Sequence, residues 1–244
     1  MKSLSLPHAG DWLHVVPTPA LCLQLWPAEF RTAVLYRLGM PVFDRDGPCV
    51  AGCGQISDRL GDHSVGCASR GERIARHNNL RDALFNTAQS AQLGPLREER
   101  ALLPGKERPA DVLLPHAAGG RHQALDVCVV SSLQCQLVNG AASEAGFALS
   151  HRYREKMRKY AEACAKEGIV FQPLPVEVLG GLHEETVNTV KKLAVSLARA
   201  SGQEEGVVSR HLFGRIGILL QRGNATLILS RTPSFPQPQV DGNL

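Results

Sequence analysis

Two aspartates in short apolar runs are the first residues whose type and surroundings point to chemistry. Asp111 opens the run 112–114, and Asp126 lies inside the run 124–130. Apolar runs of this length, bounded by proline and glycine, are typical of buried strands. A buried carboxylate must be paired, hydrogen-bonded or bound to a metal ion, because an isolated buried charge is costly. Two such carboxylates on strands joined by a turn can converge on one divalent cation.

A second group of residues has the composition of a zinc site. Three residues separate Cys49 from Cys53, three separate His63 from Cys67, and nine lie between the two pairs. Soft ligands in close pairs suit tetrahedral zinc, and a complete Cys3His set indicates a closed structural site. The alternative is three unrelated buried cysteines and a surface histidine. The odd number of cysteines, seven, favours a reducing compartment over a disulfide framework.

Basic residues gather in two segments with helical periodicity, 71–93 and 150–168. They are Arg73, Arg76 and Arg81 in the first segment, and Arg152, Arg154, Lys156, Arg158 and Lys159 in the second. Lys156, Lys159 and Tyr160 can share one helix face. A solvated basic face is the alternative for the second segment. In the first, His77 lies near the apolar stripe, so a packed core histidine is as plausible as a functional one.

The elements that must position these residues follow a definite order. A helix at 27–38 precedes the cysteines, and the helix 71–93 is followed by a strand at 96–103 that carries Glu98 and Glu99. The two aspartate strands come next. After them come a loop at 133–149, the helix from Ser150 as N-cap to Gly168, and a strand at 169–179. Pro173 and Pro175 place that last strand at a sheet edge.

Composition excludes several classes of protein. The chain has 244 residues and a net charge of +4, so nucleic-acid binding depends on where the charge lies rather than on its total. No apolar run is long enough to span a membrane, and the first residues lack a signal-peptide pattern. We therefore expect a mixed α/β protein inside the cell, with C-terminal helices at 182–199 and 206–229, the latter either one helix or a pair broken at Gly223.

This αβββαβ order with two acids resembles the core of the PD-(D/E)xK nuclease superfamily. Pro109 and Asp111 resemble one half of its motif with one residue inserted, and Asp126 the other half, with Cys128 where lysine is expected. More specifically, residues 10–230 resemble the C-terminal region of site-specific non-LTR retrotransposon polyproteins. There a Cys-Cys-His-Cys knuckle precedes an Arg-His pair, matching Arg76 and His77, and a restriction-like endonuclease follows.

The resemblance implies a function and a set of roles. Asp111 and Asp126 would bind Mg²⁺ or Mn²⁺, with Glu98 or Glu99 as accessory ligands. Lys156 or Lys159, beside Tyr160, would supply the missing lysine, and the four knuckle residues would bind structural Zn²⁺. The expected contacts to DNA come from Arg73, Arg76, His77, Arg81, Arg152 and Arg158. Such a nuclear endonuclease would nick target DNA for integration and could also meet the RNA of its parent element.

The resemblance also implies a division of the chain. We expect an N-terminal linker and helix at 1–46, the knuckle at 47–70, the nuclease core at 71–181, C-terminal helices at 182–231 and a disordered tail at 232–244. Because no reverse transcriptase core precedes the knuckle, a truncated or reused copy is expected. The rival interpretations are a catalytically inactive nucleic-acid-binding module and a zinc-stabilised protein–protein adaptor.

Overall fold

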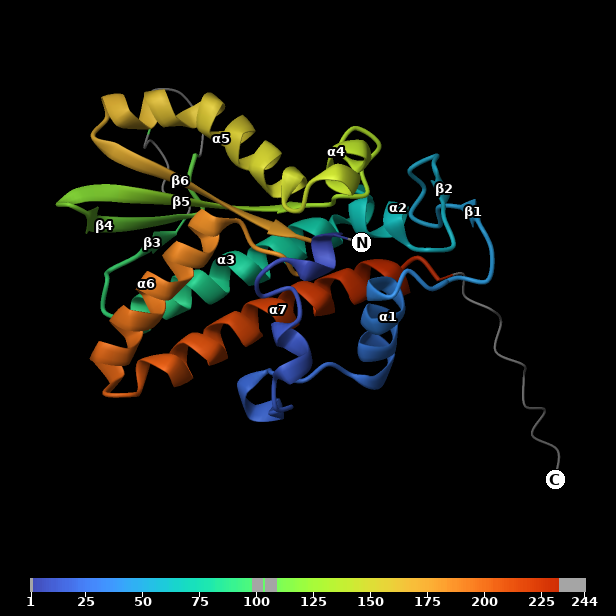
Figure 1. Cartoon of the computed structure of the whole chain (residues 1–244), viewed down its shortest axis with the longest axis horizontal. Coiled ribbons are helices and arrows are strands. Elements are labelled where there is room, and N and C mark those ends of the chain that lie inside the picture. The colour runs from blue at the N-terminus through green and yellow to red at the C-terminus, as the bar shows by residue number, and fades with distance from the viewer. Residues whose placement is uncertain (1, 98–102, 104–108, 233–244) are drawn as a thin grey trace.

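A four-stranded sheet lies between two layers of helices (Figure 1). The computed structural model describes residues 2–97, 103 and 109–232. Helix α5 (Phe147–Lys166) covers one face of the sheet, and α3 (Glu72–Ser90), α6 (Glu184–Ser201) and α7 (Glu205–Leu229) cover the other. The predicted mixed α/β class is therefore confirmed. The predicted tail from 233 onward lies outside the described residues.

The strand order in the sheet is β3-β4-β5-β6, formed by β3 (Leu96–Arg97), β4 (Val112–Ala118), β5 (Arg121–Val130) and β6 (Ile169–Glu177). The first three strands are antiparallel, and β5 pairs with β6 in parallel. Gly119 and Gly120 turn the chain between β4 and β5 with φ of 60° and 82°, values that side chains with a Cβ avoid. The prolines of β6 lie on an edge strand, as predicted. Glu98 and Glu99, expected in the continuation of β3, lie outside the described residues.

The connection from β5 to β6 is a helical crossover, as parallel pairing requires. It contains α4 (Val138–Ser143), inside the expected loop, and then α5. The prediction of Ser150 as N-cap is wrong, because Gly146 occupies that position and the Ser150 amide donates to the Gly146 carbonyl at 2.9 Å. The sequence signal failed because serine also fits inside a first turn, where its N–H finds a helical partner.

Successive side chains of β5 point to opposite faces of the sheet and pack into two separate cores. Leu125 and Val127 face α3, α6 and α7 in the larger core, together with Leu174 of β6. Ala124 and Phe171 face α5 in a smaller core. Asp126 belongs to the α5 side of the strand, because neighbouring residues of a strand point to opposite faces.

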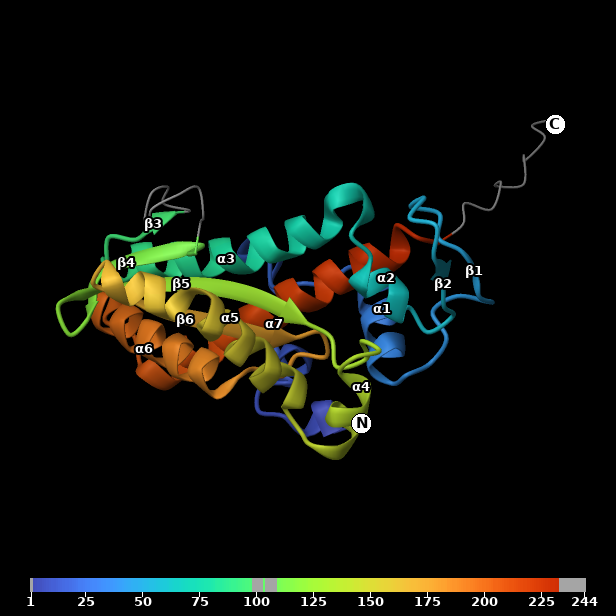
Figure 2. The same ribbon diagram turned by 90° about the horizontal axis from the view of Figure 1, so that it is seen from above.

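Helix α7 is a single helix, so of the two expected alternatives the pair broken at Gly223 is not formed. A Cβ on Gly223 would lie 2.5 Å from Cγ of Arg76, so the glycine allows close approach of α3 instead of ending the helix. Figure 2 shows α7 running along most of the molecule. It contacts α3, α6, α1 (Pro27–Arg37), α2 (Asp62–Gly66) and the 3-10 turn η2 (Asp11–His14).

The N-terminal part of the chain packs around the C-terminal half of α7. The helix predicted to open at Pro27 is present as α1. The remaining short elements are η1 (Lys2–Ser5), η3 (Pro19–Leu21), β1 (Gly47–Pro48), β2 (Ile56–Ser57) and η4 (Ser69–Gly71). Trp12 is buried in a small cluster with Ala33 and Ile218. Among the described helices, none is long and apolar enough to cross a membrane.

We predict that Leu174→Ala lowers the free energy of unfolding by about 2–5 kcal/mol, because Leu174 is fully buried in the larger core. Urea denaturation measures this quantity. Leu96→Ala is the matched control, since Leu96 lies in the same sheet but is 45% exposed. It should cost about 1 kcal/mol or less. Equal losses in the two variants would contradict the assigned core.

Candidate functional site

Asp111 is held firmly at the start of β4. Its backbone N–H donates to the Leu125 carbonyl at 2.9 Å, which aligns it with β5. Its side-chain Oδ2 accepts a hydrogen bond from the Val127 amide at 2.7 Å and lies 3.1 Å from Nε2 of His77. Three elements thus fix one carboxylate oxygen, and the side chain retains 15% exposure.

His77 joins helix α3 to this acid. Its Nε2 lies 3.1 Å from Asp111 Oδ2 and 3.0 Å from the Val127 carbonyl oxygen, so one N–H faces two acceptors. The hydrogen bond to Asp111 raises the pKa of His77 against the opposing effect of burial. The expectation of a packed core histidine is therefore too simple, because the imidazole contacts a candidate ligand directly.

Asp126 forms an ion pair with Lys156 on the α5 side of the sheet. Nζ of Lys156 is 3.1 Å from Oδ1 and 2.9 Å from Oδ2, but only the contact with Oδ1 has hydrogen-bond geometry. Oδ2 is buried and has no hydrogen bond within the described residues. Burial raises the pKa of Asp126 to about 6, with Asp111 adding to the rise and Lys156 opposing it. The same pairing raises the pKa of Lys156 although burial lowers it.

The structure separates the two candidate lysines. Lys156 reaches Asp126, whereas Nζ of Lys159 lies 4.7 Å from the ring centroid of Tyr160. Tyr160 packs against Phe171, with ring centroids 5.4 Å apart, and joins the smaller core. Cys128, at the position where the motif expects lysine, is a buried thiol whose pKa rises to about 12, through burial first and then Asp126.

The donor set suits a hard cation in type. Two carboxylates, one with a buried oxygen that lacks a hydrogen bond, are the oxygen ligands that Mg²⁺ and Mn²⁺ take, and the Val127 carbonyl oxygen lies beside them. Among the described residues, His77, Asp111 and Asp126 do not form a group of three ligands that could hold a metal ion as they stand. Sequence reasoning missed the two backbone groups of Val127, because no side-chain pattern reports a backbone contact.

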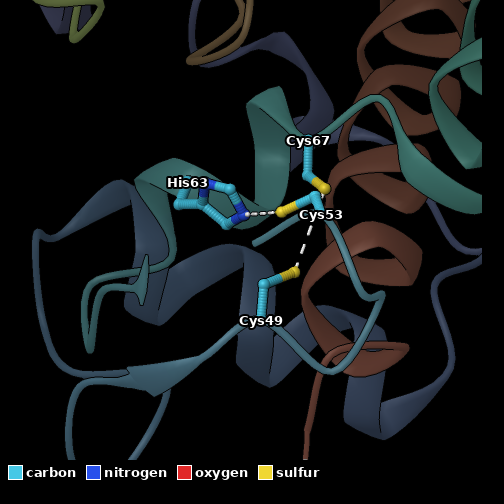
Figure 3. A group of neighbouring side chains, drawn as sticks. All are labelled: Cys49, Cys53, His63 and Cys67. Carbon is cyan, nitrogen blue, oxygen red and sulfur yellow. Dashed lines mark hydrogen bonds between the residues drawn. The ribbon is translucent and has the colours of Figure 1, made fainter. Parts of the chain in front are cut away.

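The four knuckle residues come together as predicted (Figure 3). Their ligand atoms all lie within 4.8 Å of one another, the one such group of three or more among the described residues. Sγ of Cys53 is 3.3 Å from Nε2 of His63, and the sulfurs of Cys49 and Cys67 are 3.9 Å apart. The three cysteines of the cluster are free thiols that form no disulfide. A Cys3His cluster that is mostly buried fits a structural zinc ion.

Local hydrogen bonds explain why this segment folds around the cluster. The Gly52 amide donates to the Cys49 carbonyl at 2.9 Å, and Gly52 has a φ of 73°. Asp58 accepts from the amides of Asp62 and His63 at 3.1 and 2.7 Å, and so caps α2. Cys67 directly follows α2. The turn therefore holds the first pair of ligands, and the capped helix holds the second.

Two of the predicted contacts to nucleic acid need correction. Arg76 and Arg81 are only 4% and 7% exposed. Arg76 donates to Asn224 Oδ1 at 2.6 Å, and Arg81 donates to Asp82 at 2.8 Å, so both guanidinium groups contact protein within the helical layer. Arg76 faces α7 and Arg81 is buried beside Asp82, which the local charge pattern did not show. The remaining predicted contacts are more accessible: Arg73 and Arg158 are exposed, and Arg152 is half-buried.

No protein-family model matches the chain, and no curated protein matches it.

We predict that the side-chain carboxyl of Asp126 titrates with a pKa of about 6 in the metal-free protein. Carbon-detected NMR of the carboxyl group measures it. Lys156→Met should raise this pKa further, because the ammonium group lowers it. Lys159→Met is the matched control and should leave it unchanged, since that amine lies over the Tyr160 ring. Equal effects of the two lysine variants would contradict the site.

The same shift affects stability. An unfolded aspartate titrates near pH 4, so the raised pKa of Asp126 favours the folded state below about pH 4 and that contribution disappears as the pH rises through about 6. The free energy of unfolding of wild type, relative to Asp126→Asn, should therefore fall between pH 4 and 7, by at most about 2–3 kcal/mol. A difference that does not change with pH would argue against the shift.

We also predict one zinc ion per chain by elemental analysis of protein purified without chelator. Cys53→Ser should abolish stoichiometric zinc, because it removes one of four ligands from a tetrahedral site. Cys22→Ser is the control, since Cys22 is exposed and lies outside the cluster. Wild-type protein without zinc would contradict the assignment.

Proposed function

We propose that this protein is a metal-dependent DNA endonuclease of the restriction-like, PD-(D/E)xK class. The single observation that carries this proposal is the gathering of Asp111, Asp126 and Lys156 from three elements of an αβββαβ order. The resemblance to the C-terminal region of site-specific non-LTR retrotransposon polyproteins supports a role in nicking target DNA, which leaves a primer for reverse transcription.

The two aspartates would hold Mg²⁺ or Mn²⁺, which when bound activates a water molecule and offsets charge on the phosphate. Asp111 is oriented for this by His77 and the Val127 amide. Asp126 must be ionised to act as a ligand, so cation binding should strengthen as the pH rises through about 6. At neutral pH its carboxylate is available.

Lys156 fits the role of the missing motif lysine. Its ammonium lies 2.9 Å from Asp126 and remains protonated, because the pairing raises its pKa. A fixed positive charge at this point can orient the attacking water or offset the charge that develops on the phosphate. The lysine comes from α5 rather than from β5. A lysine at the position of Cys128 is therefore not required.

DNA would approach over the basic residues near the site. Arg158 on α5 and Arg73 on α3 are exposed. Arg152 is half-buried and pairs with Glu155 at 2.8 Å. Such groups contact phosphates without reading sequence. The zinc knuckle would position DNA or brace the fold, and the RNA of a parent element is a further proposed partner. A DNA substrate of this kind implies a nuclear location.

A second candidate function is a catalytically inactive nucleic-acid-binding module. Two observations favour it. Lys156 pairs with Asp126, and among the described residues His77, Asp111 and Asp126 do not form a group of three ligands that could hold a metal ion. In this case the basic surface and the knuckle would still bind nucleic acid. Binding would weaken steeply with salt, because phosphate contacts release counterions.

We predict that the purified protein nicks supercoiled plasmid in Mg²⁺ or Mn²⁺. Asp111→Asn, Asp126→Asn and Lys156→Met should each lower the nicking rate about 100-fold or more, because each removes a preorganised charge from the site. Gel conversion of supercoiled to open-circular plasmid measures the rate. Lys159→Met tests the other candidate lysine and should lower it by less than about tenfold, in keeping with a charge that acts on binding.

Contamination by another nuclease is the main alternative explanation of nicking. It is excluded when the three site variants, purified in the same way, lose activity together. Wild-type protein that binds DNA in a salt-sensitive manner but never nicks it would favour the inactive module. Protein that neither nicks nor binds DNA would overturn both proposals.

A further inference from the structure

Arg231, just after the end of α7, is a charged residue whose side chain is fully enclosed by protein. Its side chain has 0% exposure. Nη1 donates to the Leu227 carbonyl at 2.9 Å and to Ser230 Oγ at 2.7 Å, and Nη2 donates to the Ser69 carbonyl at 3.0 Å. Nε is buried and has no hydrogen-bond partner of ordinary geometry among the described residues. An enclosed guanidinium group with an unused donor requires an explanation.

The contacts of Arg231 lie directly beyond the last knuckle residue. Ser69 and Glu72 follow Cys67 by only a few positions, and the Glu72 carboxylate is 3.3 Å from Nη2. Helix α2, which ends at Cys67, packs against α7. Figures 1 and 2 place the hairpin of β1 and β2 beside the same end of α7. Arg231 therefore binds the knuckle segment from outside the four ligands.

Charge balance gives a reason for a buried cation here. Three thiolates and one neutral imidazole around Zn²⁺ carry a net charge of −1, and a buried anion of this kind needs a positive partner. Glu72 is the carboxylate paired with Arg231 in the described residues, but its side chain is 18% exposed and lies at the rim. Within the knuckle segment, the guanidinium group donates to the Ser69 carbonyl, two positions after Cys67.

We propose that Arg231 is a positioning residue of the zinc site, which offsets the charge of the cluster and fastens the knuckle segment to the end of α7 through the Ser69 carbonyl. This inference rests on the zinc binding proposed above. It also connects the two candidate sites, because α7 carries Asn224, the partner of Arg76, which precedes His77 in α3. Groups that support metal ligands from outside the ligand set typically contribute about 10–100-fold to metal affinity.

Zinc affinity of the full chain, measured by competition with a chromogenic chelator, tests the proposal. Arg231→Gln should weaken zinc binding about 10–100-fold, and Arg231→Lys should weaken it less, since it keeps the charge but not the fork of donors. The Co²⁺-substituted protein should show a shifted thiolate-to-metal charge-transfer band in both variants. These spectra report on the ligand environment, which a general loss of stability would not change.

Arg222→Gln is the matched control. Arg222 is another α7 arginine that donates to a backbone carbonyl, that of Cys22 at 2.9 Å, and it lies outside the set of knuckle contacts. It should leave zinc affinity within about threefold of wild type. This change is smaller than the loss of about 10–100-fold expected when a group that supports the metal ligands is removed. If Arg231→Gln fails to fold, Glu72→Gln decides instead, because it loosens Arg231 while keeping the guanidinium. That variant should weaken zinc binding at least about threefold.

The outcomes separate the two proposals. Wild-type protein that takes up no zinc overturns both the zinc site and the role of Arg231. Wild-type protein that binds zinc, with unchanged affinity and spectra in the Arg231 variants, overturns only the role of Arg231. If Arg231→Gln does not fold, an unchanged zinc affinity in Glu72→Gln likewise overturns only the role of Arg231.

Discussion

The parallel pairing of β5 with β6 is the constraint on which the rest of the structure depends. Two consecutive parallel strands need a crossover, and the crossover here places α5 over one face of the sheet. Asp126 points to that face from the central strand β5, where its charge is costly to bury. Lys156 of α5 offsets this cost at 2.9 Å. The same crossover thus buries Asp126 beneath α5 and supplies the lysine of α5 that pairs with it.

The two acids are held from opposite sides of the sheet. Asp126 is paired from the α5 layer, whereas Asp111 is bonded by His77 of α3, which belongs to the other layer. Val127 directly follows Asp126 in β5 and contributes its amide to Asp111 and its carbonyl to His77. A shift of either helical layer would therefore move one acid relative to the other. The separation of the carboxylates depends on packing rather than on the loop between the strands.

Residues close in sequence were predictable, and residues brought together by packing were not. The spacing of Cys49, Cys53, His63 and Cys67 indicated their cluster, because a short turn and one helical turn bring ligands together locally. The edge position of β6 followed from its prolines. In contrast, the burial of Arg76 depends on Gly223, far along the chain, and a helical pattern cannot reveal which neighbour covers a basic residue. The choice between Lys156 and Lys159 likewise depended on where the sheet lies beneath α5.

The long reach of α7 has a consequence for how the chain is made. Arg231 and Ser69 are 162 positions apart, so during translation the knuckle segment emerges well before the side chain that encloses it. At about 5–20 residues per second, the interval is roughly ten to thirty seconds. Throughout it, the sheet face that α7 covers and the knuckle both remain incompletely packed on the nascent chain. Metal capture by the four ligands during this interval would protect the thiols from oxidation before the final helix closes over them.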